Sequence, residues 1–342
     1  PATSHHTVVV PILDSSTADI ELPPLDASSV KEALMASGMD DDERADEAGR
    51  LARRSITALR RRLARKAELH QPAWARTPVP RLARGVLLAG RWREDSEADR
   101  DRVSELVGKP YDEAREDLAA LAATEDPFIA RIGSAIHLVS AVDAWILLGT
   151  RLTVEDVRAF SDLAVLVLSE VDPALELPDG ERWWRAGVEG VGRAHSAELR
   201  RGVAQSLALL GAYGDSIGLS DGSTGAEWAE ATVRQILAAA NEDASGRTWQ
   251  SLDGVMTWLA EAGPDSFCRA VAMACTGEPP VAIHLFTDQT EQGLSSHSQH
   301  SDLLWALETA YGQPFALATR NAWLRAYWFL ANLLRAGARE AA

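Results

Sequence analysis

One short segment has a spacing typical of serine hydrolases. Gly218 to Gly222 reads GLSDG, which matches the G-x-S-x-G pattern that presents a nucleophilic serine between a strand and a helix. Ser220 would need a strand before it, and an acid and a histidine after it. The preceding residues, LALLGAYG, are instead typical of the end of a helix. We therefore interpret the segment as a polar turn capped by Ser223 or Thr224, and a hydrolase is a distant third hypothesis.

Histidines offer a second kind of chemistry. His297 and His300 stand three apart in SHSQHSD with Asp302 nearby, and two imidazoles could share a zinc ion with ligands from elsewhere. The spacing indicates no third ligand, so a solvated loop that caps the next helix is favoured. His137 and His195 have no nucleophile placed beside them, so surface or capping roles are expected. No metal site is expected.

Nucleotide hydrolysis through a phosphate-binding loop is excluded. Such a loop needs G-x-x-x-x-G-K-[ST] after a strand, because backbone amides and one lysine wrap the phosphates. The only Gly-Lys pair, Gly108-Lys109, is followed by Pro110. Cys268 and Cys275 share one face of a predicted helix, and buried, reduced thiols are expected. We therefore expect no catalytic residue, no cofactor and no enzyme.

A basic segment raises the question of nucleic-acid binding. Residues 51–69 read LARRSITALRRRLARKAEL and hold seven bases. On a helix over 55–66, three apolar residues form a narrow stripe: Ile56, Leu59 and Leu63. At 100° per residue, Arg61 and Arg65 lie opposite that stripe. The candidate contacts to a partner or to nucleic acid are the arginines around this outer face, Arg60, Arg61, Arg62 and Arg65.

The surrounding charge weakens the case for DNA. Residues 25–70 hold ten bases and nine acids, and the whole chain has a formal net charge of −16. The charge of a whole unit, more than that of one helix, governs nonspecific affinity for phosphates. An internal, charge-balanced face is therefore the favoured interpretation. Docking to a partner or to a nucleotide-binding domain comes next, and DNA binding last.

Two adjacent tryptophans are further candidate contacts. ERWWRAG places Trp183 and Trp184 between two arginines in a predicted loop. Adjacent tryptophans cannot both point inward on a helix, so one of them could be an exposed anchor for a partner. Packing of this loop onto its neighbours is the favoured alternative.

The elements that would position these residues are nearly all helical. We expect four regions: an extended strand (7–13) and linker over 1–24, a helix-turn-helix-like unit over 25–72, a winged-helix-like unit over 73–139, and an α-helical array over 140–342. The helices of the array pair at intervals near HEAT-repeat size, without a repeated motif. The fold class is thus all-α, an irregular HEAT-like array with one short β-hairpin. The opening strand has no obvious partner nearby, which suggests a piece of a longer protein.

The winged-helix-like unit has the best-marked pattern. A helix (EADRDRVSELVG), a turn (KP), a second helix (YDEAREDLAALAA) and a hairpin (PFIARIGSAIHLVS) follow in order, with the hairpin bend at Gly133 and Ser134. The second helix is expected to bury four residues: Tyr111, Ala114, Leu118 and Leu121. Its outer face would show three acids, Asp112, Glu113 and Glu116. That face has the wrong sign for phosphates.

The composition is ordinary for a folded, soluble chain, at 46% hydrophobic and 25% charged residues. No signal peptide is visible. The most apolar stretch, FALATRNAWLRAYWFLANLLRAG, is interrupted by arginines and does not read as a membrane span. A cytoplasmic location and no membrane partner are expected.

Several segments together resemble a known family. LARRSITALRRRLARKAELHQPAWA, DAWILLGTRLTVEDVRAFSDLAVLVLSEVDPALELP, HSAELRRGVAQSLALLG and HSDLLWALE resemble the helical region behind the nucleotide-binding core of large bacterial STAND-type ATPases, some of them antiviral sensors. The resemblance covers most of residues 7–311 and consists of packing and capping motifs. In that family these helices form a winged-helix lid and a repeat-containing arm that senses a partner. The motifs of the core are missing here, so no catalytic residue is carried over.

The leading expectation is a non-catalytic helical interaction and regulatory module, the sensing or lid-and-arm part of a STAND-type signalling ATPase. Its partner would be a protein, or a nucleotide-binding domain missing from this chain. The alternative is a DNA-binding transcriptional regulator that uses the basic helix over 55–66.

Overall fold

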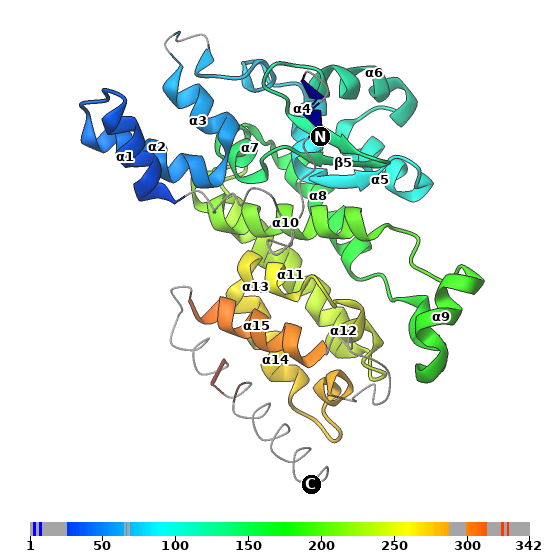
Figure 1. The fold of residues 1–342 in the computed structure, drawn as a ribbon. Coiled ribbons are helices and arrows are strands. Elements are labelled where there is room, and N and C mark those ends of the chain that lie inside the picture. Colours follow the sequence, from blue (N-terminus) through cyan, green and yellow to red (C-terminus); the bar gives the residue numbers. More distant parts are fainter. Residues whose placement is uncertain are drawn as a thin grey trace. The chain divides into compact units, whose positions relative to one another are not determined.

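The structure is a computed structural model of the 342-residue chain. It describes residues 3–4, 7–8, 26–64, 66, 69–286, 299–312, 323–324 and 327. The chain divides into two compact units, Pro1–His70 and Gln71–Ala342 (Figure 1). The described residues contain fifteen α-helices and two small antiparallel sheets, which confirms the mainly helical fold class. The finer region boundaries expected from the sequence stay predictions.

The first unit contains three helices, α1 (Ala27–Ala36), α2 (Asp42–Arg54) and α3 (Ile56–Leu63). Each begins at a side chain that accepts a backbone N–H from the first turn: Asp26, Asp41 and Ser55. Ser55 also ends α2, so a single residue joins α2 to α3. This is the tight join that the sequence indicates.

Two short strands open the first unit. β1 (Thr3–Ser4) and β2 (Thr7–Val8) pair antiparallel, with Thr3 opposite Val8. The expectation that the opening strand lacks a nearby partner was therefore wrong, because the partner lies directly before it. The rest of the predicted strand, 9–13, lies outside the described residues.

The second unit begins with the order of a winged helix. Its elements are α4 (Arg81–Ala89), β3 (Arg91–Arg93), α5 (Glu97–Val107), α6 (Tyr111–Ala122), β4 (Ile129–Ile132) and β5 (Ala135–Leu138). The strands form one sheet in the order β3-β5-β4. The hairpin bends at Gly133, whose φ of 61° favours glycine. The sequence predicts this hairpin but not β3, because three residues of RWR are too short to show an alternating pattern.

The array continues with nine more helices: α7 (Ala141–Leu148), α8 (Val154–Leu168), α9 (Asp179–Glu189), α10 (Ala197–Tyr213), α11 (Gly225–Glu242), α12 (Arg247–Ser251), α13 (Met256–Ala262), α14 (Pro264–Ala274) and α15 (Gln299–Tyr311). Short 3-10 turns lie at Ala73–Ala75, Gly149–Arg151, Pro173–Glu176, Gly214–Ser216 and Val281–Leu285. Capping boxes at Thr153 and Thr224 begin α8 and α11. None of the described helices is both long and apolar enough to cross a membrane.

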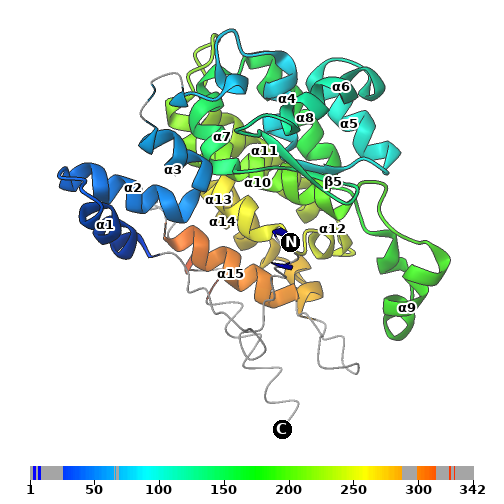
Figure 2. The ribbon, with the colours of Figure 1, turned by 45° about the horizontal axis from the view of Figure 1, so that its top comes forward.

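Helix α10 connects the winged helix to the later helices (Figure 2). It packs against α4 and β3 on one side and against α11 and α13 on the other. Gly202 permits the close approach to β3, because a Cβ there would stand 2.4 Å from the backbone nitrogen of Arg91. One continuous apolar core runs from the winged helix through these helices.

Two buried carboxylates fix the winged helix on the array. Asp99 on α5 is fully buried and accepts hydrogen bonds from Arg93 N at 2.9 Å, Ser196 N at 3.0 Å and Ser196 Oγ at 2.5 Å. Ser196 is the N-cap of α10. Arg84 on α4 pairs with the buried Asp156 of the α8 capping box at 2.7 Å. Since buried polar groups need such partners, these bonds specify how the elements meet.

Candidate functional site

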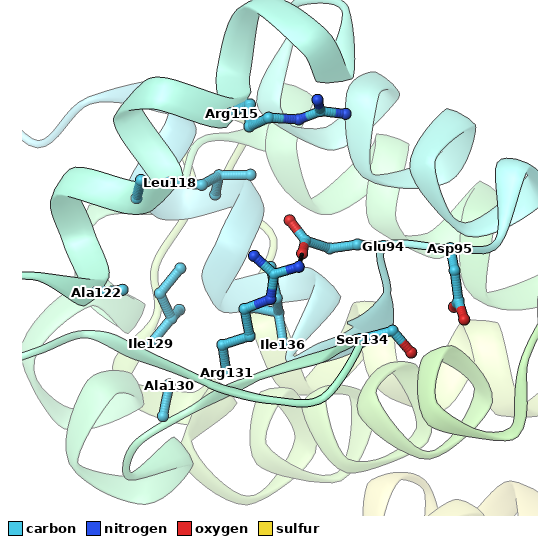
Figure 3. A pocket seen from close by; sticks show the side chains of 11 residues that line it. Glu94, Asp95, Arg115, Leu118, Ala122, Ile129, Ala130, Arg131, Ser134 and Ile136 are labelled. Atoms are coloured by element: carbon cyan, nitrogen blue, oxygen red, sulfur yellow. Dashed lines mark ion pairs between the residues drawn. The ribbon is translucent and has the colours of Figure 1, made fainter.

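A cavity of about 380 Å³ opens between α6 and the sheet of the winged helix (Figure 3). Its apolar lining comes from one helix and two strands: Leu118, Ala119, Ala122, Ile129, Ala130 and Ile136. Its polar lining lies on the side of the loop after β3 and the hairpin: Glu94, Asp95, Arg115, Arg131 and Ser134. No histidine or cysteine is among the described residues that line it. The cavity thus combines an apolar floor with two carboxylates, two guanidinium groups and one hydroxyl.

The periodicity of each element places these side chains together. On α6, one helical stripe with spacing i, i+3, i+4 and i+7 lines the cavity: Arg115, Leu118, Ala119 and Ala122. In the sheet, Arg131 stands directly opposite Ile136 and so points to the same face. The hollow exists because two positions of the α6 stripe are alanines, which do not reach across to the sheet.

A chain of hydrogen bonds holds Glu94 in the lining of the cavity. Buried Trp92 donates through Nε1 to the Tyr111 hydroxyl at 2.9 Å, and that hydroxyl donates to Glu94 Oε1 at 3.3 Å. Burial raises the pKa of Tyr111 to about 12, so the hydroxyl remains a donor at neutral pH. Arg131 Nη2 lies 2.6 Å from Glu94 Oε2 (Figure 3). The Glu94 side chain is only 16% exposed, whereas that of Arg131 is 63% exposed.

Asp95 adds a second fixed charge to the polar side. Arg93 reaches its carboxylate with Nη2 at 2.6 Å and Nε at 2.8 Å. Hydrogen bonding from Arg93 holds the pKa of Asp95 well below its usual range. Asp95 therefore stays ionised beside the cavity throughout the neutral range.

The outer face of α6 is acidic, as the sequence predicts. Four exposed carboxylates project from it: Asp112, Glu113, Glu116 and Asp117. Arg115 pairs with Asp112 at 2.8 Å, and Lys109 pairs with Asp117. No ion pair forms at Glu113 or Glu116 within the described part of the chain. The inner face buries Tyr111, Ala114 and Leu118 as expected, with Leu121 partly buried.

The basic helix α3 differs from its sequence prediction. Arg61 is only 7% exposed, whereas Ile56 is 54% exposed. The expectation that Arg61 points outward, opposite an apolar stripe, was therefore wrong. The buried line of α3 runs instead through Ser55, Ala58 and Arg61, three residues apart, and α3 packs against α2. On α2, three alanines are buried: Ala45, Ala48 and Ala52.

The other arginines of α3 do not form one free surface. Arg62 pairs with Glu47 of α2, with Nη2 2.6 Å from Oε2. Arg60 is exposed but has an interaction of its own. Arg65 lies outside the described residues. The helix is thus balanced in part by its acidic neighbour.

The paired tryptophans belong to a helix and not to a loop. Trp183 and Trp184 lie within α9. Arg185 stabilises this helix through ion pairs to Glu181 at 2.8 Å and to Glu189 at 2.7 Å, each one turn away. The loop prediction missed this i, i+4 pattern. Trp184 is 43% exposed, while the side chain of Trp183 lies outside the described residues.

The remaining candidates form structural contacts. Ser220 is exposed in a turn that follows α10, where Asp221 accepts a hydrogen bond from Ser223 Oγ at 2.6 Å and Thr224 caps α11. His300 stacks on Phe286 with ring centroids 5.3 Å apart. His297 lies outside the described residues. No group of three metal-binding side chains gathers in the described ranges.

Both cysteines are free thiols, as predicted. Cys268 is buried and Cys275 is partly buried. Burial raises the pKa of each thiol to about 12. Neither thiol is therefore poised to act as a nucleophile.

A partly buried polar cluster that the sequence does not predict lies between the end of α8 and the start of α10. His195 Nδ1 lies 2.8 Å from Glu170 Oε2. Buried Arg200 donates to the backbone carbonyls of Val167 and Ser251. These partners lie far apart in sequence, so no local pattern could have joined them. Their role is to bind helix ends to one another.

No family model, curated protein or solved structure matches the chain.

Proposed function

We propose that this chain is a non-catalytic helical interaction module that regulates or senses through a protein partner. One observation carries the proposal. In winged-helix and helix-turn-helix DNA readers, the second helix of the motif enters the major groove. Here that helix is α6, and its exposed face has four carboxylates against one arginine, Arg115. A surface of this sign repels a phosphate backbone and suits a basic protein surface.

The finer proposal is that the module is the winged-helix lid and sensing arm of a bacterial STAND-type signalling ATPase, with antiviral sensing as one such role. Two observations support it. The winged helix packs directly on α8 and α10 through the buried Asp99 and Asp156, as a lid coupled to an arm would require. The sequence segments that resemble the family span both regions. The partner would then be a nucleotide-binding domain outside this chain or a sensed protein, in the cytoplasm.

DNA binding through α3 has weaker support. Arg61, one of the residues that would face the duplex, is buried, and Arg62 is paired with Glu47. Each such engagement removes a cation from the phosphate contacts on which affinity depends. We therefore rank this alternative below protein binding.

Affinity capture tests the proposal. The full chain is immobilised on a resin and incubated with a bacterial lysate. The wild type should retain a protein from the lysate that the variant Glu113→Lys/Glu116→Lys does not retain. The control reverses the same number of exposed charges elsewhere, Glu242→Lys on α11 and Glu308→Lys on α15, and should retain it. Capture of nucleic acid in place of protein would contradict the proposal.

The finer proposal has its own test in the coding sequence. A phosphate-binding loop encoded in frame before Pro1 would support the STAND assignment. A start codon just upstream would count against it and would leave the interaction module itself standing.

A further inference from the structure

We propose that the cavity between α6 and the sheet receives an aliphatic side chain from a basic segment of a protein partner. This inference rests on the proposed function and specifies the chemistry of the partner. The segment would lie along α6, with its aliphatic residue in the cavity and its bases against the carboxylates of α6 and Glu94.

The size and lining of the cavity define the aliphatic part. At about 380 Å³, the cavity is small among ligand sites, which span roughly 300–1,000 Å³, and it suits one or two side chains. Its floor consists of three buried apolar residues, Leu118, Ile129 and Ile136. A leucine, isoleucine or methionine placed there would exclude water from this floor. A charged group placed there would lose its hydration without a partner.

The carboxylates beside the cavity define the basic part. Asp112 and Glu116 lie one turn apart on α6, next to the stripe that lines the cavity. Glu116 has no ion pair in the described part of the chain, and Asp112 is highly exposed in its pair with Arg115. A lysine or arginine on either side of the aliphatic residue could reach this pair. The chain's net charge of −16 would speed the encounter with such a segment.

Glu94 gives the site an exchangeable ion pair. Tyr111 holds the Glu94 carboxylate in place, while Arg131, on the outside, is mostly exposed (Figure 3). Arg131 can therefore turn into solvent when a base of the partner takes its position. The exchange leaves no buried carboxylate unpaired, which would otherwise be strongly unfavourable.

A peptide fits these features better than nucleic acid or lipid. Phosphates and anionic headgroups share the sign of the α6 face and would be repelled. Glu94 and Asp95 in the lining of the cavity add two carboxylates that suit the bases of a peptide. The inference is thus a peptide-binding site that combines one apolar pocket with a row of carboxylates.

The experiment uses short random peptides displayed on phage and selected on the immobilised full chain. Peptides that emerge are synthesised, labelled and titrated by fluorescence anisotropy. Ala119→Trp fills the cavity, and Ala120→Trp places the same bulk one residue away, outside it; both positions are exposed, so folding should tolerate either change. Glu116→Lys tests the charge, with Glu242→Lys on α11 as its control. Circular dichroism checks that each variant is folded.

Selected peptides should combine leucine, isoleucine or methionine with lysine or arginine. Ala119→Trp should weaken their binding about tenfold or more, which corresponds to about 1.4 kcal/mol. Glu116→Lys should also weaken it, whereas Ala120→Trp and Glu242→Lys should not. An empty selection, acidic peptides, or binding unchanged in Ala119→Trp would overturn the inference.

The proposed function and the peptide-binding site can be contradicted separately. If the chain captures protein from a lysate and the peptide test fails, the proposed function stands and the peptide site falls. If the chain captures DNA instead of protein, the proposed function falls with it.

Discussion

The two helix-turn-helix units of this chain have opposite charges and hold them in different ways. The α2–α3 unit carries the basic helix, yet Arg61 is buried and Arg62 is paired with Glu47 of the neighbouring helix. The α5–α6 unit carries the acidic helix, where Glu113 and Glu116 have no ion pair within the described residues. The positive charge of α3 is thus partly neutralised within its own unit, whereas the carboxylates of α6 are exposed to solvent.

The charge of a single helix is therefore a poor guide to its partner. The neighbours of each side chain decide how much of that charge reaches solvent. The two units are also stabilised in different ways. The basic unit has half-exposed ion pairs, whereas the acidic unit is fixed by the fully buried Asp99.

The largest expected effect follows removal of Asp99. Asp99→Ala should lower the free energy of unfolding by about 3 kcal/mol, because Arg93 N, Ser196 N and Ser196 Oγ lose a charged acceptor. Urea denaturation measures the change. The exposed Asp101→Ala on the same helix is the control and should stay within about 0.5 kcal/mol of the wild type. Equal losses in the two variants would show that the hydrogen bonds to Asp99 do not stabilise the α5–α6 unit.

A smaller loss is expected at Tyr111. Tyr111→Phe leaves the buried Trp92 Nε1 without its acceptor and removes one of the two donors to Glu94, which should cost about 1–3 kcal/mol. Thermal denaturation measures it, with the exposed Tyr311→Phe as the matched control. A loss of stability no greater than that of the control would show that the hydrogen bonds of Tyr111 do not stabilise the fold.

The same hydroxyl makes a prediction about pH. Burial raises the pKa of Tyr111 from 10.0 to about 12, so the contribution of Tyr111 to stability is fully present below pH 10.0 and is lost as the pH rises towards 12. A difference titration of tyrosinate absorbance, wild type minus Tyr111→Phe, should have its midpoint near pH 12. A midpoint at 10.0 would mean that the hydroxyl is solvated.

The smallest effect belongs to the basic unit. Glu47→Gln breaks the half-exposed pair with Arg62 and should change the free energy of unfolding by about 1 kcal/mol or less. Added salt should shrink the difference, because exposed pairs are screened. A change in the free energy of unfolding as large as that of Asp99→Ala would show that the half-exposed ion pair stabilises its unit as strongly as the buried carboxylate does.

The sequence predicts what depends on local pattern. The helix-turn-helix around Gly108 and Pro110, the hairpin at Gly133 and the acidic face of α6 all follow from spacing and turn chemistry. Strand β3 was missed because it is short. The cavity was missed because it needs the alanines of α6 to meet Ile129 and Ile136, which only the folded chain brings together.

Packing between helices also explains why the predicted orientation of α3 was wrong. Apolar periodicity favours Ile56 as an inward residue, but α3 packs on α2 with Ala58 and Arg61 buried and Ile56 exposed. That choice depends on the shape of a neighbouring helix. Similarly, nothing near Asp99 in sequence indicates that Ser196, ninety-seven residues later, will donate to it.

We propose that this molecule binds protein through its acidic winged helix and does not read DNA through its basic helix. Anisotropy of a labelled, mixed-sequence DNA duplex, titrated with the full chain at ~150 mM salt, tests it most directly. The account predicts no binding tighter than ~10⁻⁴ M, the weak end of nonspecific affinity. Tighter, sequence-selective binding that Arg60→Ala/Arg62→Ala abolishes would contradict it.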